Sequence, residues 1–301
     1  MREEYHIISD GSCDLPTELV QEKNITVVPF YVSFDDKNYL KEGVDIEVRD
    51  FYQQMVDQKG VYPKSCMPGI KDFEEAFLPY VKEKIPVICI CITTKFSGST
   101  QSALNARDMV LENYPDAEIT VIDSTVNTVL QGIYVMEAVR LRDSGASYAD
   151  AVARLDEIKS TGRIFFTVGD MEYLKHGGRI GKVAAVAGSV LGIRPVITLM
   201  QGEIFPSGIG RSRRKTTEKS LELLVEYLKE SSLSADCYSY TIGFGYDMQE
   251  AEEFRDHVIE TLQKNGFDVK EIPLYQIGAA ISVHTGPYPL GLAVVEKSIH
   301  D

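Results

Sequence analysis

Apolar runs of strand length alternate with amphipathic stretches through the first half of the chain. Four such runs occur, at residues 5–9, 25–34, 87–94 and 119–123. Turns of small residues follow them, and apolar residues at helical spacing follow the turns. We therefore expect helices at residues 16–23, 70–84, 99–114 and 124–145. This alternation predicts β-α-β units, whose parallel sheet is covered by helices on both faces.

The second half has a different pattern. Gly145 is typical of the end of one helix and Ser147 of the cap of the next, and the change comes after residue 162. Strands are expected at 163–170, 237–246 and 267–276, and helices at 183–192, 215–231 and 247–266. Residues 194–208 predict a hairpin that turns at 201–203, and residues 277–298 predict two apolar strands joined by a Gly/Pro turn.

The length of the chain favours two domains. Single hydrophobic cores usually stop growing near the size of this 301-residue chain. We place the boundary near Thr161. The predicted fold class is α/β, with residues 1–160 forming an N-terminal parallel-sheet sandwich and residues 161–301 a C-terminal α/β domain with a mixed sheet.

Composition and charge narrow the classes of partner. The chain is 44% hydrophobic and 25% charged, which is typical of a globular protein with a sizeable core. Its 45 acidic and 31 basic residues give a net charge of −14. This charge repels nucleic acid and anionic membrane surfaces over most of the molecule. We expect neither nucleic-acid binding nor stable insertion into a membrane, since no apolar run approaches membrane-spanning length.

The cysteines and the N-terminus point to a cytoplasmic location. Five cysteines are scattered along the chain, which does not resemble a disulfide framework, and Cys89 and Cys91 lie on one face of an apolar strand. The N-terminus reaches its first strand almost at once and leaves no apolar segment long enough for a signal peptide. These features favour a reducing compartment.

Short hydroxyl and carboxylate side chains gather where strands pass into helices. Four turns have this composition, at residues 9–16, 65–69, 93–100 and 123–128. In a doubly wound sheet such turns lie together beyond the carboxyl ends of the strands, where unpaired N–H groups of helix N-termini favour an anion. The alternative is that their serines, Ser97 among them, only cap helices. Several such turns at one edge favour a ligand head group.

Common catalytic and cofactor motifs are missing from the sequence. The segment “GGRIGK” at 177–182 is one residue short of a P-loop, and Val183 follows where that motif has Ser or Thr. No G-x-G-x-x-G, H-E-x-x-H, paired C-x-x-C or G-x-S-x-G pattern occurs. Metal-dependent, nucleotide-binding and hydrolase functions are therefore disfavoured, and we expect no metal and no cofactor.

One histidine and two basic segments are further candidates. His284 stands at the end of an expected apolar strand, where it is either structural or a donor to an anion held by the serine turns. Basic residues cluster at 173–182, which contains Arg179, and at 210–215, which contains Arg211. These segments are either solvated surface or docking sites for an acidic partner or a phosphorylated substrate.

Six segments occur in the order seen in DegV-like proteins. They are “SDGSCDLP” (9–16), “PKSCMPG” (63–69), “TTKFSGSTQSA” (93–103), “VIDS” (121–124), “YLKHGGRIGKVAAVAGSVLGIRPVI” (173–197) and “HTGPYPLGLA” (284–293). The chain thus resembles the DegV family along nearly its whole length. The resemblance implies a two-domain α/β protein that encloses a single long-chain fatty acid, with the acyl tail in an apolar tunnel.

The resemblance also implies roles for individual residues. The carboxylate is expected to be held by Ser65 and Ser97, with the backbone N–H of Gly98 nearby, and His284 is expected to support this head-group network. Two further residues match basic positions that engage a kinase subunit, namely Arg179 and Arg211. The sequence departs from the family at Cys66 and Met67, where Ser and Gln are usual, and at Tyr288 and Pro289.

The function that follows is binding and presentation of a lipid. The resemblance extends to the binding subunit of bacterial fatty acid kinase, which presents its fatty acid to a separate ATP-dependent subunit for conversion to an acyl phosphate. We interpret the chain as such a subunit and not as a catalyst. Two alternatives stay open: an enzyme acting alone on a small anionic metabolite, with His284 as acid or base, and a lipid-sensing regulatory protein.

Overall fold

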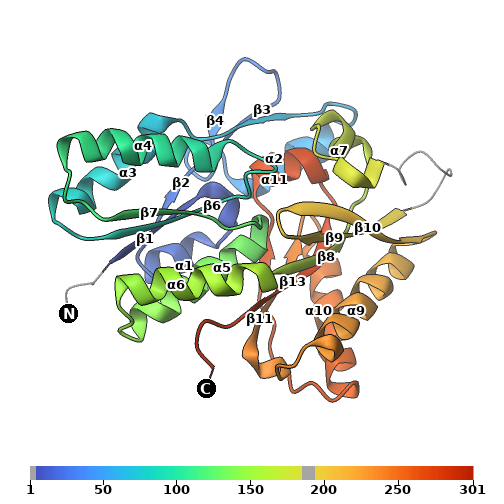
Figure 1. Cartoon of the computed structure of the whole chain (residues 1–301). Coiled ribbons are helices and arrows are strands. Elements are labelled where there is room, and N and C mark those ends of the chain that lie inside the picture. The colour runs from blue at the N-terminus through green and yellow to red at the C-terminus, as the bar shows by residue number, and fades with distance from the viewer. Residues whose placement is uncertain (1–4, 185–193, 301) are drawn as a thin grey trace.

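The first half of the chain forms a parallel sheet between two layers of helices, as predicted. The computed structural model describes residues 5–184 and 194–300. The sheet has the strand order β2-β1-β6-β7, and its strands are β1 (His6–Asp10), β2 (Ile25–Val28), β6 (Val87–Cys91) and β7 (Ile119–Asp123). Helices α3 (Ile70–Lys82) and α4 (Ser99–Asn113) lie on one face (Figure 1). The other face carries α1 (Thr17–Glu22), α5 (Thr128–Asp143) and α6 (Tyr148–Ile158).

A small antiparallel sheet projects from this layer, and the sequence did not predict it. Its strands are β3 (Tyr31–Ser33), β4 (Leu40–Lys41) and β5 (Lys64–Cys66), in the order β4-β3-β5. The single strand expected over residues 25–34 was wrong, because the run divides at Pro29 into β2 and β3 of different sheets. Proline has no N–H to donate to a strand ladder. Helix α2 (Val48–Asp57) was also not predicted.

The second half forms a mixed sheet of six strands in the order β10-β9-β8-β13-β11-β12. The strands are β8 (Arg163–Thr167), β9 (Arg194–Met200), β10 (Glu203–Gly210), β11 (Tyr238–Phe244), β12 (Leu274–Gln276) and β13 (Leu290–Glu296). The predicted β9–β10 hairpin is confirmed, and its turn places Gln201 and Gly202 at positive φ. Helices α9 (Arg213–Glu230) and α10 (Met248–Lys264) pack on one face of this sheet (Figure 1). The helix expected at 183–192 falls mostly in residues 185–193, outside the described residues.

Two short helices in the second half were not predicted. Residues 277–285 were predicted as an apolar strand, but they form the helix α11 (Ala279–Thr285). Six of its seven residues are buried, so no polar face marks a helical period. Helix α7 (Glu172–His176) precedes the glycine-arginine turn. The strand expected over 267–276 shortens to the three residues of β12.

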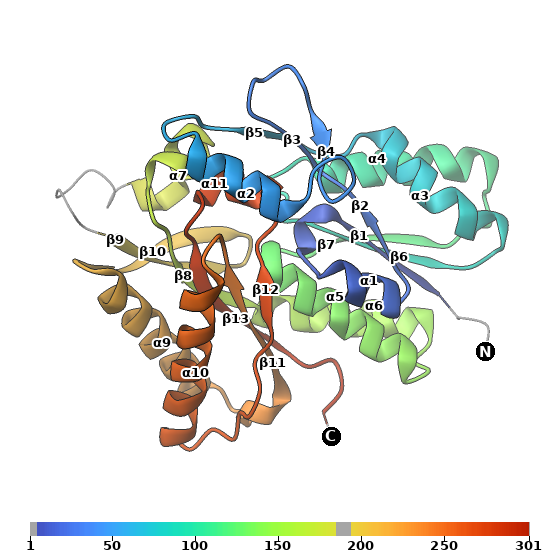
Figure 2. The same ribbon diagram turned by 180° about the vertical axis from the view of Figure 1, so that it is seen from behind.

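Helix α5 packs against both large sheets, and α11 packs against the small sheet and α2. One buried cluster joins Ile90 of β6, Val129 of α5, Ile197 of β9 and Ile281 of α11. Figures 1 and 2 show α11 near the middle of the molecule, with α2 beside it. The two halves therefore share a core, and the domain boundary near Thr161 stays a prediction. Within the described ranges, none of the helices has the length and apolar character needed to cross a bilayer.

Candidate functional site

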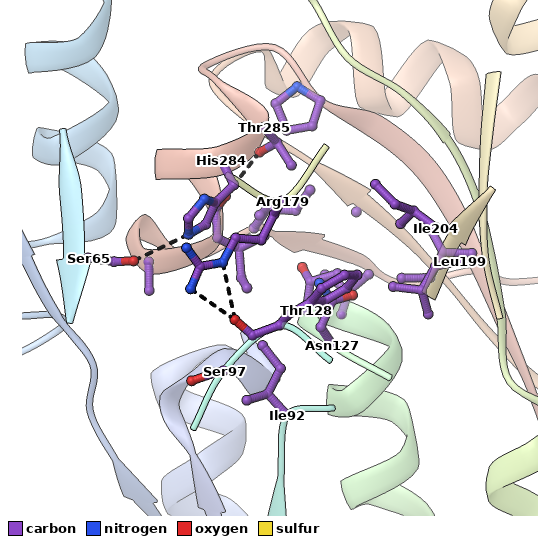
Figure 3. A pocket seen from close by; sticks show the side chains of 18 of the residues that line it. Ser65, Ile92, Ser97, Asn127, Thr128, Arg179, Leu199, Ile204, His284 and Thr285 are labelled. Atoms are coloured by element: carbon purple, nitrogen blue, oxygen red, sulfur yellow. Dashed lines mark hydrogen bonds between the residues drawn. The ribbon is translucent and has the colours of Figure 1, made fainter. Parts of the chain in front are cut away.

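A cavity of about 310 Å³ lies between the two large sheets and brings most of the predicted site residues together. Ser65, Ser97, Gly98, His284 and Arg179 all line it. The rest of the wall is mainly apolar and includes Ile92, Phe166, Leu199, Ile204 and Ile281. In Figure 3, Ser65 and His284 lie on one side of the cavity, and Leu199 and Ile204 lie on the other. The cavity therefore has a polar end and an apolar end, within the usual size range of ligand sites.

His284 and Ser65 form the centre of the polar end. His284 lies in the last turn of α11, not at the end of a strand as expected, and its Nε2 is 3.3 Å from the Ser65 hydroxyl. Burial lowers the pKa of His284 to about 4, and the positive charge of Arg179 contributes to the shift. The imidazole is therefore neutral near pH 7 and can donate from only one nitrogen.

Gly177 lets the backbone approach this imidazole closely. A methyl group added at Gly177 would collide with Nδ1 of His284. The next residue, Gly178, has a φ of 68°, a conformation that glycine adopts without strain. The paired glycines singled out in the sequence therefore shape the wall behind His284.

Ser97 and Gly98 form the turn before α4. Gly98 is the N-cap of that helix, and the Ser97 hydroxyl accepts a hydrogen bond from the Ser99 N–H at 3.2 Å. Ser97 therefore both supports the helix start and faces the cavity, so the two interpretations of the serine turn are compatible at this residue. A methyl group at Gly98 would lie 2.9 Å from the sulfur of Met67, so these two turns pack tightly.

Asp10 is a structural anion that the sequence reading missed. Its buried carboxylate accepts hydrogen bonds from the hydroxyls of Ser12 and Ser99, from the Ile92 N–H and from the Gln131 amide. Burial raises the pKa of Asp10, and these hydrogen bonds, the one from Ser99 above all, oppose the shift. Ser12 and Ser99 therefore bind the protein's own carboxylate and hold the turns in place. The sequence signal was the aspartate at the end of the first strand.

Arg179 crosses the opening of the polar end. Its Nε and Nη2 donate to the Phe96 carbonyl at 3.2 and 3.1 Å, and its Nη1 donates to the Gly177 carbonyl at 2.8 Å. These bonds connect the turn after α7 to the turn that carries Ser97 (Figure 3). Arg211 does not line this cavity; it is exposed in the turn between β10 and α9.

Asn127 and Thr128 also line the cavity and were not named from the sequence. The sequence pattern indicates their turn, residues 123–128, without distinguishing either residue. The buried Oδ1 of Asn127 has no hydrogen-bond partner among the described residues. Thr128 has a φ of 49°, and its hydroxyl donates to Asp14. Among the described residues, no group of three or more His, Cys, Asp or Glu side chains is arranged to hold a metal ion.

Comparison with known proteins gives consistent matches along the chain. The model of the family described as “Uncharacterised protein, DegV family” matches residues 4–297. A DegV domain-containing protein of Caldanaerobacter subterraneus is 30% identical, with 98% of this chain and all of that protein covered.

Solved structures show the same fold. A stearic acid-binding protein from Eubacterium ventriosum is 44% identical with a TM-score of 0.93, and the match covers 98% of this chain and 99% of that one. A DegV family protein from Thermus thermophilus, whose structure is described as showing fatty acid binding, is 25% identical with a TM-score of 0.86. The match covers 97% of this chain and 99% of that one. The α/β architecture predicted from the sequence is confirmed.

Proposed function

The chain belongs to the DegV family, and from this premise we propose that it binds one long-chain fatty acid. The carboxylate lies at Ser65, Ser97 and His284, and the acyl tail lies against the apolar wall. The observation that carries this proposal is the cavity itself, in which polar side chains occupy one end and apolar side chains the other. The two similar structures whose descriptions specify fatty acid binding support it.

The polar end suits a carboxylate. Hydroxyl groups of Ser65 and Ser97 donate hydrogen bonds, and the exposed Arg179 guanidinium supplies positive charge beside them. The apolar end suits the tail, because each buried methylene contributes about 0.8 kcal/mol. The tail thus supplies most of the affinity and the head group sets the orientation.

We further propose that the protein presents this acid to an ATP-dependent fatty acid kinase subunit, which forms the acyl phosphate. The protein itself is not the catalyst in this scheme. The exposed Arg179 at the polar end and the exposed Arg211 after β10 are the docking residues. The extensive apolar wall disfavours an enzyme that acts on a small metabolite. A regulatory lipid sensor would bind the same fatty acid but would not pass it to a kinase subunit.

Mass spectrometry of the freshly purified, denatured protein tests the binding step. One fatty acid per chain is expected. A protein that carries none, and that takes up neither stearate nor oleate after delipidation, would rule out the lipid function.

A reconstituted assay with an ATP-dependent kinase subunit tests the transfer step. We expect acyl phosphate to form from the bound acid only when both proteins and ATP are present. Full lipid occupancy without transfer to any cognate subunit would instead favour the regulatory alternative.

A further inference from the structure

A carboxylate holds the N-terminus of the helix that carries His284. Glu42, directly after β4, accepts hydrogen bonds from the N–H groups of Ala279 and Ala280, the first two residues of α11. We propose that Glu42, with Asp14 beside it, is a positioning residue that sets His284 against Ser65 in the head-group site. The inference rests on the proposed fatty acid binding and assigns a role in it to residues outside the cavity.

Helix geometry makes this coupling direct. His284 lies five residues after Ala279, about 8 Å along the axis at about 1.5 Å per residue. Helix α11 has only seven residues, so its first and last turns together include the whole helix. We therefore expect it to move as one unit. Releasing its N-terminus therefore changes the direction of the His284 side chain and the 3.3 Å contact with Ser65.

Asp14 extends the connection to a second wall of the cavity. One of its oxygens accepts the hydroxyl of Thr128, which lines the cavity at the start of α5. A methyl group added at Gly278 would collide with both Asp14 Oδ1 and Glu42 Oε1, so the two carboxylates converge on this glycine. The acid pair therefore joins the N-terminus of α11 to the start of α5, at the end of α11 opposite His284.

The two carboxyl groups share a buried setting. Burial raises the pKa of both, to about 7 for Glu42, and the negative charge of Glu42 raises the pKa of Asp14 further. Hydrogen bonds to Ala280, Ala279 and Thr128 oppose these shifts. Near neutral pH the pair therefore retains a proton, which allows the two groups to lie together.

Other titratable and charged groups lie around the pair. Asp10 and Cys13 lie on the β1 side and Tyr52 on α2, where burial and both carboxylates raise the pKa of the phenol. Glu47 and Arg49 line a neighbouring cavity of about 520 Å³ that also includes Asp14 and Glu42. The raised carboxyl pKa values mean that stabilisation by the bound proton is complete below about pH 4 and is lost as pH rises through about 7.

As the pair loses its proton, repulsion between the two adjacent carboxylates opposes their shared position at the N-terminus of α11, so we expect the affinity for fatty acid to fall as pH rises from 6.5 to 9. His284 does not titrate in this window, since its pKa is about 4. An ordinary fatty acid carboxyl is ionised throughout it. The experiments use a Cys66→Ser background, so that the exposed thiol lining the cavity does not contribute.

The first experiment measures the Kd of oleate, by displacement of a fluorescent fatty acid, at pH 6.5 and pH 9. We expect the parent to bind about fivefold to tenfold more weakly at pH 9. Glu42→Gln keeps an acceptor for α11 and removes one titrating group, so its Kd should change less than about twofold between the two pH values. Glu42→Ala should bind at least about tenfold more weakly than the parent at pH 6.5. Glu47→Ala removes an exposed carboxylate that makes no hydrogen bond to α11 among the described residues, so it should match the parent.

The second experiment is a double-mutant cycle with His284→Ala. If Glu42 acts through His284, Glu42→Ala should cost little further affinity once the imidazole is absent. Additive losses, or equal affinity of Glu42→Ala and the parent, would overturn the positioning role. If Glu42→Ala does not fold, an unaltered pH profile in Glu42→Gln overturns it equally. A parent that binds no fatty acid at all refutes the proposed function instead.

Discussion

Positive charge surrounds a neutral imidazole at the polar end of the cavity. Burial and the nearby Arg179 lower the pKa of His284 to about 4. We therefore predict that NMR titration finds a neutral His284 ring down to about pH 5, and that Arg179→Ala raises its pKa. Because the folded pKa lies below the ordinary value of about 6.5, this residue's contribution to stability is present above about pH 6.5 and is lost on acidification toward pH 4. A ring that titrates near pH 6.5 in the folded protein would contradict this environment.

The role proposed for Ser97 predicts a change in affinity for fatty acid. A hydrogen bond to a charged group contributes about 1.5–3 kcal/mol, so Ser97→Ala should weaken fatty acid binding by about tenfold to a hundredfold. Ser65→Ala should act in the same direction but less strongly, since the thiol of Cys66 or a water can partly substitute. Ser160→Ala, at an exposed serine outside the cavity, is the control. Equal retention of oleate by Ser97→Ala and the control would remove Ser97 from the head-group site.

The local pattern indicated the turns of the polar end, and the resemblance assigned the individual residues Ser65, Ser97, Gly98 and His284. Ser97 and Gly98 precede a helix that the pattern predicted, whereas Ser65 lies in β5, a strand that the pattern missed. The function of Asp10 and Glu42 was not predictable. Each acts through contacts with residues distant in sequence, Gln131 for Asp10 and Ala279 for Glu42, and sequence spacing carries no signal for such contacts.

At the scale of elements, the sequence predicted the helices and strands with regular periodicity and failed where burial was complete or chain turns were tight. The parallel sheet and the β9–β10 hairpin were correct. Helix α11 was read as a strand because a short buried run shows no polar face. The break at Pro29 was overlooked because the apolar residues on both sides form one continuous run.

The residues of α11 and of the segment before it that line the cavity allow a prediction about the acyl tail. Ala280, Ile281 and His284 line the cavity from one face of α11, and Ile277, two residues before the helix, lines it as well. Ile277 thus lies beyond the N-terminus of α11, whereas His284 lies in its last turn. A methyl group added at Gly243 would meet Val129 at 2.8 Å and Ile277 at 3.4 Å.

Gly243→Ala should therefore shorten the space for the tail. We expect its bound fatty acids to be shorter on average than those of the parent by mass spectrometry, whereas Val129→Ala should admit longer ones. Gly208→Ala, in β10 and outside the cavity, is the matched control. Identical chain-length profiles in all four proteins would show that the tail does not reach this end.

At the scale of the whole molecule, the two exposed arginines of the docking proposal stand on a chain with a net charge of −14. Lys182, three residues after Arg179, pairs with Glu203 at the start of β10, and Arg211 follows the end of that strand. The eight residues of β10 span about 26 Å at about 3.3 Å per residue. This length is comparable with the width of a protein–protein contact of about 800 Å² per partner, so one kinase subunit can reach both arginines.

Docking through these arginines predicts a defect in transfer that depends on salt. Arg211→Ala lies outside the cavity, so it should retain full fatty acid occupancy and form acyl phosphate more slowly, with the difference from the parent shrinking as salt screens the remaining attraction. Arg179→Ala should show the larger transfer defect, because its side chain lies at the opening where the head group meets the partner. Lys270→Ala removes the same charge between α10 and β12 and serves as the control.

The measurement is a reconstituted kinase assay run beside a measurement of lipid occupancy for each variant. Normal transfer by both arginine variants at full occupancy would exclude this docking surface, whereas loss of fatty acid from Arg179→Ala alone would assign that residue to the head-group site.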